Sequence, residues 1–170
     1  MIMGRVVEVL YGSNLGCDDP QDVFTLASQV LQIEQQLSKA QRTFPSTLQL
    51  IEPHDLVHGP GSSSDALLKF RVIYTLRYHN LRILMHRPLL HRYLEVLSSQ
   101  AGDVQQIAPL GQVGVNSLRT CVQSASSIVE LMSRLSSSTE RVRELSGAWW
   151  FSLFYSKALI APSYRENETV

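Results

Sequence analysis

The sequence predicts an all-α protein, a multi-helix bundle of about five helices around one central helix that is kinked at a proline. Three observations support this fold class. Long stretches carry apolar residues at helical spacing, no useful length alternates as a strand would, and segments rich in glycine, proline and serine separate the helical stretches. A chain of 170 residues can bury a core as one domain, which we place at 1–162, followed by a polar tail at 163–170.

The central helix is expected from Asp65 to Leu97. Its apolar residues form two strips on nearly opposite sides, which predicts that the helix is packed on both sides. The broad strip comprises Leu67, Phe70, Ile73, Tyr74, Tyr78, Leu81, Leu84 and Met85, and the narrow strip comprises Val72, Leu76 and Ile83. Arg77 falls within the broad strip, so we expect its head to be buried against a carboxylate or several backbone carbonyls.

Pro88 lies close to the end of this helix and has no amide hydrogen, so the carbonyl of Leu84 loses its helical partner. The preceding residue, Arg87, is also biased away from helical angles. Either the helix kinks near His86, or it breaks and Pro88 begins a second helix. We favour the kink, and we expect His79 and His86 to make polar contacts in the bundle or to cap the Leu84 carbonyl.

Further helices are expected at residues 1–11, 20–42, 116–135 and 140–161, with loops at 12–20, 45–64 and 98–114. The third of these helices has a regular apolar stripe: Leu118, Cys121, Val122, Ala125, Ile128, Val129, Met132 and Leu135. The last one is apolar on almost every side between Ala148 and Ala161, so it requires cover all round.

The charges balance at 15 basic and 15 acidic residues, which argues against nucleic acid or an acidic membrane as a partner. Acidic residues dominate before residue 65 and basic residues dominate the central helix, so we expect the central helix to face acidic neighbours. Cys17 and Cys121 are too few for a disulfide framework or a four-cysteine metal site, which favours a reduced intracellular setting.

Specific chemistry finds little support. His79 and His86 share a helix flank with Arg82 between them, and no third ligand stands at matching spacing, which argues against a metal site. Arg77, Arg82, Arg87 and Arg92 recur every five residues and so spread around the helix, which argues against a DNA-binding face. The apolar run from Ala148 to Ala161 is too short to span a bilayer. Motifs of catalysis or phosphate binding are absent from the sequence, so we predict that the protein is not an enzyme.

Several segments, taken in order, resemble a known family. Tyr78-His79, followed after leucine-rich spacing by His86-Arg87-Pro88 and two leucines, resembles the middle regulatory region of fungal binuclear zinc-cluster transcription factors. FPSTLQL at 44–50, CVQSASSIVELM at 121–132 and WWFSLFYSKAL at 149–159 are similar to other parts of that region. The resemblance covers about residues 20 to 160.

The resemblance implies a regulatory and interaction domain of a transcription factor in the nucleus, for which Tyr78, His79, His86, Arg87 and Pro88 are structural motif residues. In that family a separate six-cysteine module holds two zinc ions and binds DNA, and this chain lacks it. We therefore expect no cofactor in this chain and DNA contact only through an absent module. We also expect a partial domain or truncated product that requires protein partners or self-association.

An alternative function is a stand-alone helical module that binds a small molecule. The residues that could line an apolar cavity for such an effector are Trp149, Trp150, Phe154 and Tyr155. Aromatic residues at helical spacing are more often core than pocket, so this alternative is the weaker one.

Overall fold

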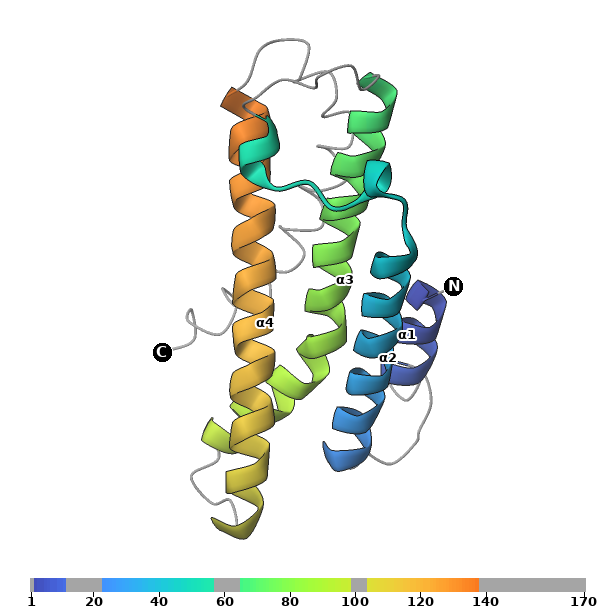
Figure 1. Ribbon diagram of the computed structural model, residues 1–170. Helices are drawn as coiled ribbons and strands as arrows, with labels where there is room; N and C mark the ends of the chain where they lie inside the picture. The colour runs from blue at the N-terminus through green and yellow to red at the C-terminus, as the bar shows by residue number, and fades with distance from the viewer. Residues whose placement is uncertain (1, 12–22, 57–64, 99–103, 138–170) are drawn as a thin grey trace. The chain divides into compact units, whose positions relative to one another are not determined.

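The computed structural model describes residues 2–11, 23–56, 65–98 and 104–137 (Figure 1). These residues form α1 (Ile2–Tyr11), α2 (Val23–Thr43), η2 (Ser46–Leu48), η3 (Pro53–Leu56), α3 (Asp65–Ser98) and α4 (Val104–Ser137). Strands are absent from this part of the chain, so the all-α prediction is confirmed. The fifth expected helix, at 140–161, and the polar tail lie outside the described residues. Of the described helices, none is long and apolar enough to cross a membrane.

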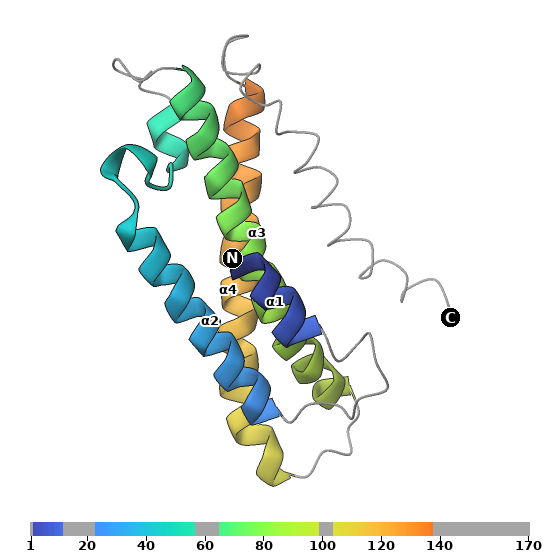
Figure 2. The same ribbon diagram turned by 90° about the vertical axis from the view of Figure 1, so that its right-hand side faces the viewer.

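The chain divides into two compact units, and α3 and α4 each contribute to both. The first unit contains residues 1–46 and 81–126, and α1 packs on α2 within it (Figures 1 and 2). Buried apolar side chains from three helices form its core: Val6 and Leu10 of α1, Leu26, Val30, Ile33 and Leu37 of α2, and Leu81, Ile83, Met85 and Leu89 of α3. The fully or nearly fully buried positions of α4 in this unit are small: Gly114, Ser117 and Ser124.

In the first unit α3 continues through Pro88 without a break and changes direction in its light green part (Figure 1). The helix therefore kinks, and the alternative of a second helix beginning at Pro88 is excluded. α3 ends at Ser98, one residue beyond the predicted end at Leu97.

α3 and α4 approach each other closely at Gly114 in the first unit. A Cβ atom at Gly114 would overlap the side chain of Tyr93 at its Cγ. Only a residue without a side chain leaves space for the aromatic ring here.

The second unit contains residues 47–80 and 127–170. Its buried residues come from the segment before α3, the first part of α3 and the last part of α4: Ile51, Leu68, Val72, Leu76, Leu131 and Leu135, with Ile128 and Met132 packed against them. Two hydrogen bonds attach the non-helical segment to α3. The Ile51 amide donates to Oγ1 of Thr75 at 3.0 Å, and Nε of Arg71 donates to the Gln49 carbonyl at 3.1 Å.

Three details of the predicted helices are wrong. Residues 98–114 were expected to form a loop, but α4 already begins at Val104. The broad strip of α3 is buried in the first unit at Leu81 and Met85, but in the second unit its Phe70 is 65% exposed. Arg77 is exposed as well, so it does not place its head in the core. The physical reason is that α3 buries Val72, Thr75 and Leu76 within the second unit, which turns the Phe70–Arg77 side outward there.

The stripe predicted on α4 is correct in part. Leu135 is buried and Cys121 is partly buried, but Leu118, Val122 and Val129 are 41%, 55% and 66% exposed. Small residues face the interior of the first unit instead, because α3 comes too close to α4 at Gly114 to leave space for larger side chains.

Candidate functional site

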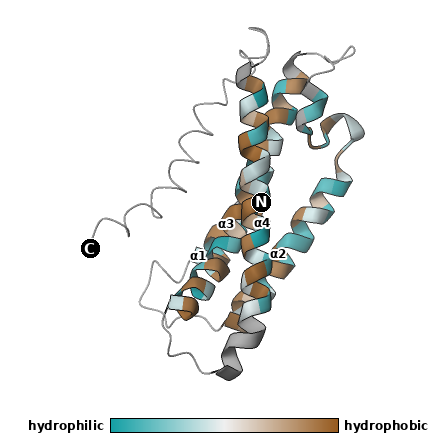
Figure 3. Ribbon diagram, turned by 90° about the vertical axis from the view of Figure 1, so that its left-hand side faces the viewer, coloured by the Kyte–Doolittle hydropathy of each residue, from teal (hydrophilic) through white to brown (hydrophobic). Residues whose placement is uncertain are grey.

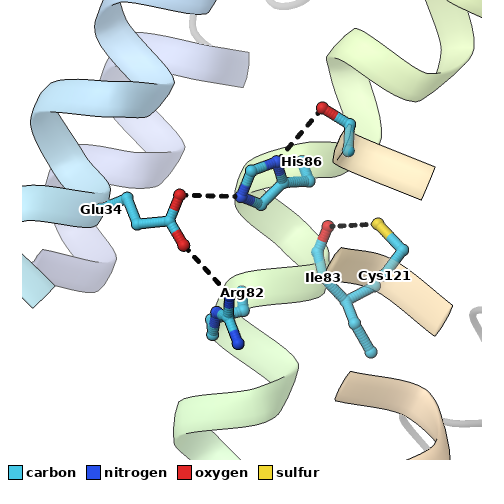
Figure 4. Close-up of polar contacts among 6 residues, drawn as sticks. Glu34, Arg82, Ile83, His86 and Cys121 are labelled. Carbon is cyan, nitrogen blue, oxygen red and sulfur yellow. Dashed lines mark hydrogen bonds and ion pairs between the residues drawn. The ribbon is translucent and has the colours of Figure 1, made fainter. Parts of the chain in front are cut away.

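A polar cluster lies inside the first unit, on the turn of α3 just before Pro88 (Figure 4). The carboxylate of Glu34, from α2, reaches across to two side chains of α3. Nη2 of Arg82 donates to Oε1 of Glu34 at 3.1 Å, and Nε2 of His86 lies 3.2 Å from Oε2. The Arg82, Glu34 and His86 side chains are 23%, 29% and 8% exposed. The prediction that the basic central helix faces acidic neighbours is confirmed where Glu34 contacts Arg82 and His86.

His86 links this carboxylate to α4. Its Nδ1 lies 3.2 Å from Oγ of Ser117, which is 1% exposed. An ionised carboxylate only accepts hydrogen bonds, so Nε2 of His86 carries the hydrogen that points to Glu34. In the neutral imidazole, Nδ1 then accepts the hydrogen bond from the Ser117 hydroxyl. A single side chain thereby connects α2, α3 and α4.

The surroundings of Glu34 favour its ionised form. The hydrogen bond from His86 is the largest cause that lowers the pKa of Glu34 below its ordinary value, and the Arg82 guanidinium lowers it further. Partial burial acts in the opposite direction without cancelling these effects. The cluster is therefore a charge-assisted network at neutral pH.

α1 also contacts this turn of α3. The hydroxyl of Tyr11, from α1, donates to the carbonyl of Leu84 at 2.8 Å. This carbonyl is the one that Pro88 leaves without a helical donor. The phenol thus replaces the missing amide hydrogen. Of the two alternatives expected for the histidines, His86 makes polar contacts in the bundle, and the cap of the Leu84 carbonyl comes from Tyr11. Burial is the main cause that raises the pKa of Tyr11, which keeps the hydroxyl protonated and able to donate.

Cys121 lies beside the preceding carbonyl of the turn, that of Ile83. Its Sγ is 3.9 Å from the carbonyl of Ile83, a weak hydrogen bond (Figure 4). Burial raises the pKa of the Cys121 thiol to about 11, so the thiol is protonated at neutral pH. Nucleophilic or metal-binding chemistry requires the thiolate, so this environment favours a structural role.

The order Ser117–His86–Glu34 is formally that of a hydrolase triad. Catalysis requires a nucleophile that a substrate carbonyl can reach, together with donors for the developing oxyanion. Ser117 is 1% exposed within a helix, and Glu34 is also bound to Arg82. Within the described ranges, moreover, no three His, Cys, Asp or Glu side chains are grouped so that they could hold a metal ion. The geometry therefore supports a structural role, in which the cluster joins α2, α3 and α4.

The predicted motif residues fall in different places. His86 is the centre of the cluster, Pro88 creates the carbonyl that Tyr11 caps, and Arg87 is exposed. Tyr78 and His79 belong to the second unit, where their rings meet edge to face with centroids 5.4 Å apart. The predicted pocket residues, Trp149, Trp150, Phe154 and Tyr155, lie outside the described residues, so the cavity stays a prediction.

Sequence reasoning missed four of the residues around this turn: Tyr11, Glu34, Ser117 and Cys121. One signal was present, because Glu34 interrupts an otherwise apolar stripe of α2 beside Ile33 and Leu37, where a carboxylate requires a partner. The other three residues had no such signal, since a lone tyrosine, serine or cysteine is common in any helix.

The chain is similar to a part of two curated fungal proteins. It is 30% identical over 159 residues to a protein named Transcription factor FBD3 from Fusarium pseudograminearum, and 29% identical over 156 residues to the protein of that name from Gibberella moniliformis. Each alignment covers 91% of this chain, and the chain spans 20% of the length of either relative. It matches no known family profile, and no solved structure resembles it significantly. The comparisons therefore show that most of this chain is similar to one fifth of two fungal proteins that are named as transcription factors.

Proposed function

We propose that this chain is a regulatory and interaction segment of a fungal transcription factor, which acts in the nucleus and modulates a DNA-binding module elsewhere in the polypeptide. The observation that carries the proposal is the similarity of 91% of the chain to proteins named Transcription factor FBD3. The sequence resemblance to the middle region of zinc-cluster transcription factors supports the finer assignment.

The polar cluster gives this proposal a structural counterpart. The hydrogen bonds of the cluster hold helices together, and the Ser117 hydroxyl, its one candidate nucleophile, is buried. This arrangement is what we expect of a scaffold that acts through its surface. No cofactor is required by this arrangement, and the zinc of the family belongs to the DNA-binding module. A role in binding an effector through the predicted aromatic residues remains a separate hypothesis.

A hybrid activator in a yeast reporter strain tests the proposal. The chain is inserted between a DNA-binding module and an activation segment, and reporter output is compared with that of a hybrid that carries a flexible linker of equal length. We expect the folded chain to change reporter output at equal protein level. The change should disappear in Val72→Asp, which places a charge at a core position that is 0% exposed, and persist in Val7→Asp, at a position that is 49% exposed.

Reporter output equal to that of the linker hybrid, with the protein folded and present at the same level, would contradict a regulatory role. An effect that is equally strong in Val72→Asp would mean that the folded domain is not what acts.

A further inference from the structure

α1 is attached to the first unit along one of its sides. Val6 and Leu10, four residues apart, are 0% and 4% exposed, whereas Val7 between them is 49% exposed. This is the spacing of an amphipathic helix, and Figure 3 shows both hydrophobic and hydrophilic segments along α1. Tyr11 follows Leu10 and donates to the Leu84 carbonyl at the bend of α3. We call the surface beneath Val6, Leu10 and Tyr11 the α1 seat.

The sequence of α1 makes it a weak helix by itself. It has ten residues, and helices this short are marginal in water without tertiary packing. Half of its residues are β-branched or glycine, which favour a helix less than alanine or leucine do: Ile2, Gly4, Val6, Val7 and Val9. Packing does not require the glycine, because a Cβ atom at Gly4 would meet nothing within 4 Å. α1 is therefore helical because it is docked, and docking and helix formation are one step.

The other helices of the first unit are joined by contacts that do not involve α1. Glu34 of α2 bonds Arg82 and His86 of α3, and His86 in turn bonds Ser117 of α4. Departure of α1 leaves these contacts in place, although it exposes the α1 seat and removes the donor to the Leu84 carbonyl. A short element with few attachments opens at a lower free energy than the whole fold.

We propose that α1 is a detachable helix, which leaves the α1 seat while α2, α3 and α4 of the first unit stay folded, and that the vacated seat binds one amphipathic helix of the same pattern. This pattern is two apolar residues four apart, followed directly by a tyrosine whose hydroxyl reaches the carbonyl that the proline leaves without a donor. α1 itself supplies that helix in this structure. The inference goes beyond the proposed regulatory role, because it concerns an opening within the domain.

Hydrogen exchange of the full chain, followed by mass spectrometry, tests whether α1 opens by itself. We expect the hydrogen-bonded amides of α1 to be protected at least about tenfold less than those of α2 while the chain stays folded. Gly4→Ala should raise the protection of α1 alone by about two- to fivefold, because alanine favours the helix and meets no neighbour. The matched control is Gly111→Ala on α4, whose methyl group also meets nothing and which should leave the protection of α1 unchanged. Equal protection of α1 and α2 overturns the proposal.

A peptide added to the full chain tests the α1 seat. Val6→Asp places a charge at a buried position, so it should release α1 and retain the other helices by circular dichroism. The probe is a fluorescent synthetic peptide of residues 1–12, whose anisotropy measures binding. The peptide should bind this variant at least about tenfold more tightly than the wild type, in which the chain's own α1 occupies the seat at a high effective concentration.

Substitutions in the peptide test the pattern. Tyr11→Phe should raise its Kd for the Val6→Asp chain about five- to thirtyfold, because the Leu84 carbonyl then stays without a donor. The control is Val7→Asp in the peptide, at an exposed position, which should leave the Kd unchanged. An unchanged Kd with Tyr11→Phe would show that the phenol is not recognised, which overturns the assigned pattern.

Two results with the Val6→Asp chain overturn the proposal. If this chain loses more helicity than the ten residues of α1 account for, α1 is an indivisible part of the core. If the chain stays folded and binds no peptide up to about 1 mM, the α1 seat is not a docking site.

Discussion

The hydroxyl of Tyr11, in α1, donates a hydrogen bond to the carbonyl of Leu84, in α3. This carbonyl lacks its usual helical donor because residue 88, four positions further along, is a proline without an amide hydrogen. Tyr11→Phe removes only the hydroxyl and leaves the ring that packs in the unit. The Leu84 carbonyl then has neither the helical donor that Pro88 lacks nor the phenol that replaces it. We expect this substitution to lower the free energy of unfolding.

The magnitude follows from the partial burial of this hydrogen bond. A buried acceptor that loses its only donor costs about 1–3 kcal/mol, and partial access of water places the expected loss near 1–2 kcal/mol. For a chain of this length, that corresponds to a decrease in melting temperature of about 3–6 °C.

A double-mutant cycle with Pro88→Ala tests the cause directly. Alanine restores an N–H at position 88, which can donate to the Leu84 carbonyl as in a regular helix. In that background Tyr11→Phe should cost less than about 0.5 kcal/mol, so the coupling energy between the two positions should be about 1 kcal/mol. Urea unfolding followed by circular dichroism measures all four variants.

Equal costs of Tyr11→Phe in the two backgrounds would refute the reasoning. In that case the phenol would stabilise the fold by some other contact, and the carbonyl freed by Pro88 would not be the reason for the tyrosine. A negligible loss of unfolding free energy for Tyr11→Phe in the wild-type background would show that Tyr11 does not stabilise the kinked helix.

Two further predictions concern the first unit. Because the fold lowers the pKa of Glu34, its stabilisation is fully present above the ordinary value of 4.5 and is lost as the pH falls through the lower folded value. Glu34→Gln should therefore lower stability by about 1–2 kcal/mol at neutral pH and flatten the decrease of melting temperature below about pH 4.5; an unchanged pH profile would show that Glu34 does not drive it. Gly114→Ala should destabilise the protein by about 1–3 kcal/mol, because its methyl group would meet Tyr93, whereas Gly111→Ala, with nothing within 4 Å, should stabilise it by up to about 1 kcal/mol. Equal melting temperatures for these two glycine variants would contradict the close approach of α3 and α4.

Local signals were sufficient where a feature depends on neighbouring residues in the chain. The bounds of α3 agree with the prediction to within one residue, because the turn-forming residues before Asp65 and the polar residues after Leu97 define its ends. The kink at Pro88 was predictable for the same reason, since proline acts on its own helix turn. The sequence predicts the start of α4 too late because Pro109, Gly111 and Gly114 are loop signals, although a helix held by its neighbours accommodates them.

The candidate site was less predictable than the helices that hold it. His86 could be named as a residue with polar contacts, whereas Glu34 was missed although it interrupts an apolar stripe of α2. Neither the partner of His86 on α4 nor the donor for Leu84 on α1 follows from spacing, because these contacts join residues 31 and 73 positions apart. Their choice depends on which helix faces meet.

The sequence by itself determined the helical class, the extent of the central helix and the position of its bend, because helical spacing, turn residues and proline act over a few neighbouring residues. Tertiary structure alone decided that Phe70 and Arg77 on the broad side of α3 are exposed, and that small residues of α4 face inward while Val122 faces outward. The physical reason is that an apolar residue can be buried on any side where another helix covers it. Which side that is depends on close approaches such as Gly114 to Tyr93, and these are made between helices.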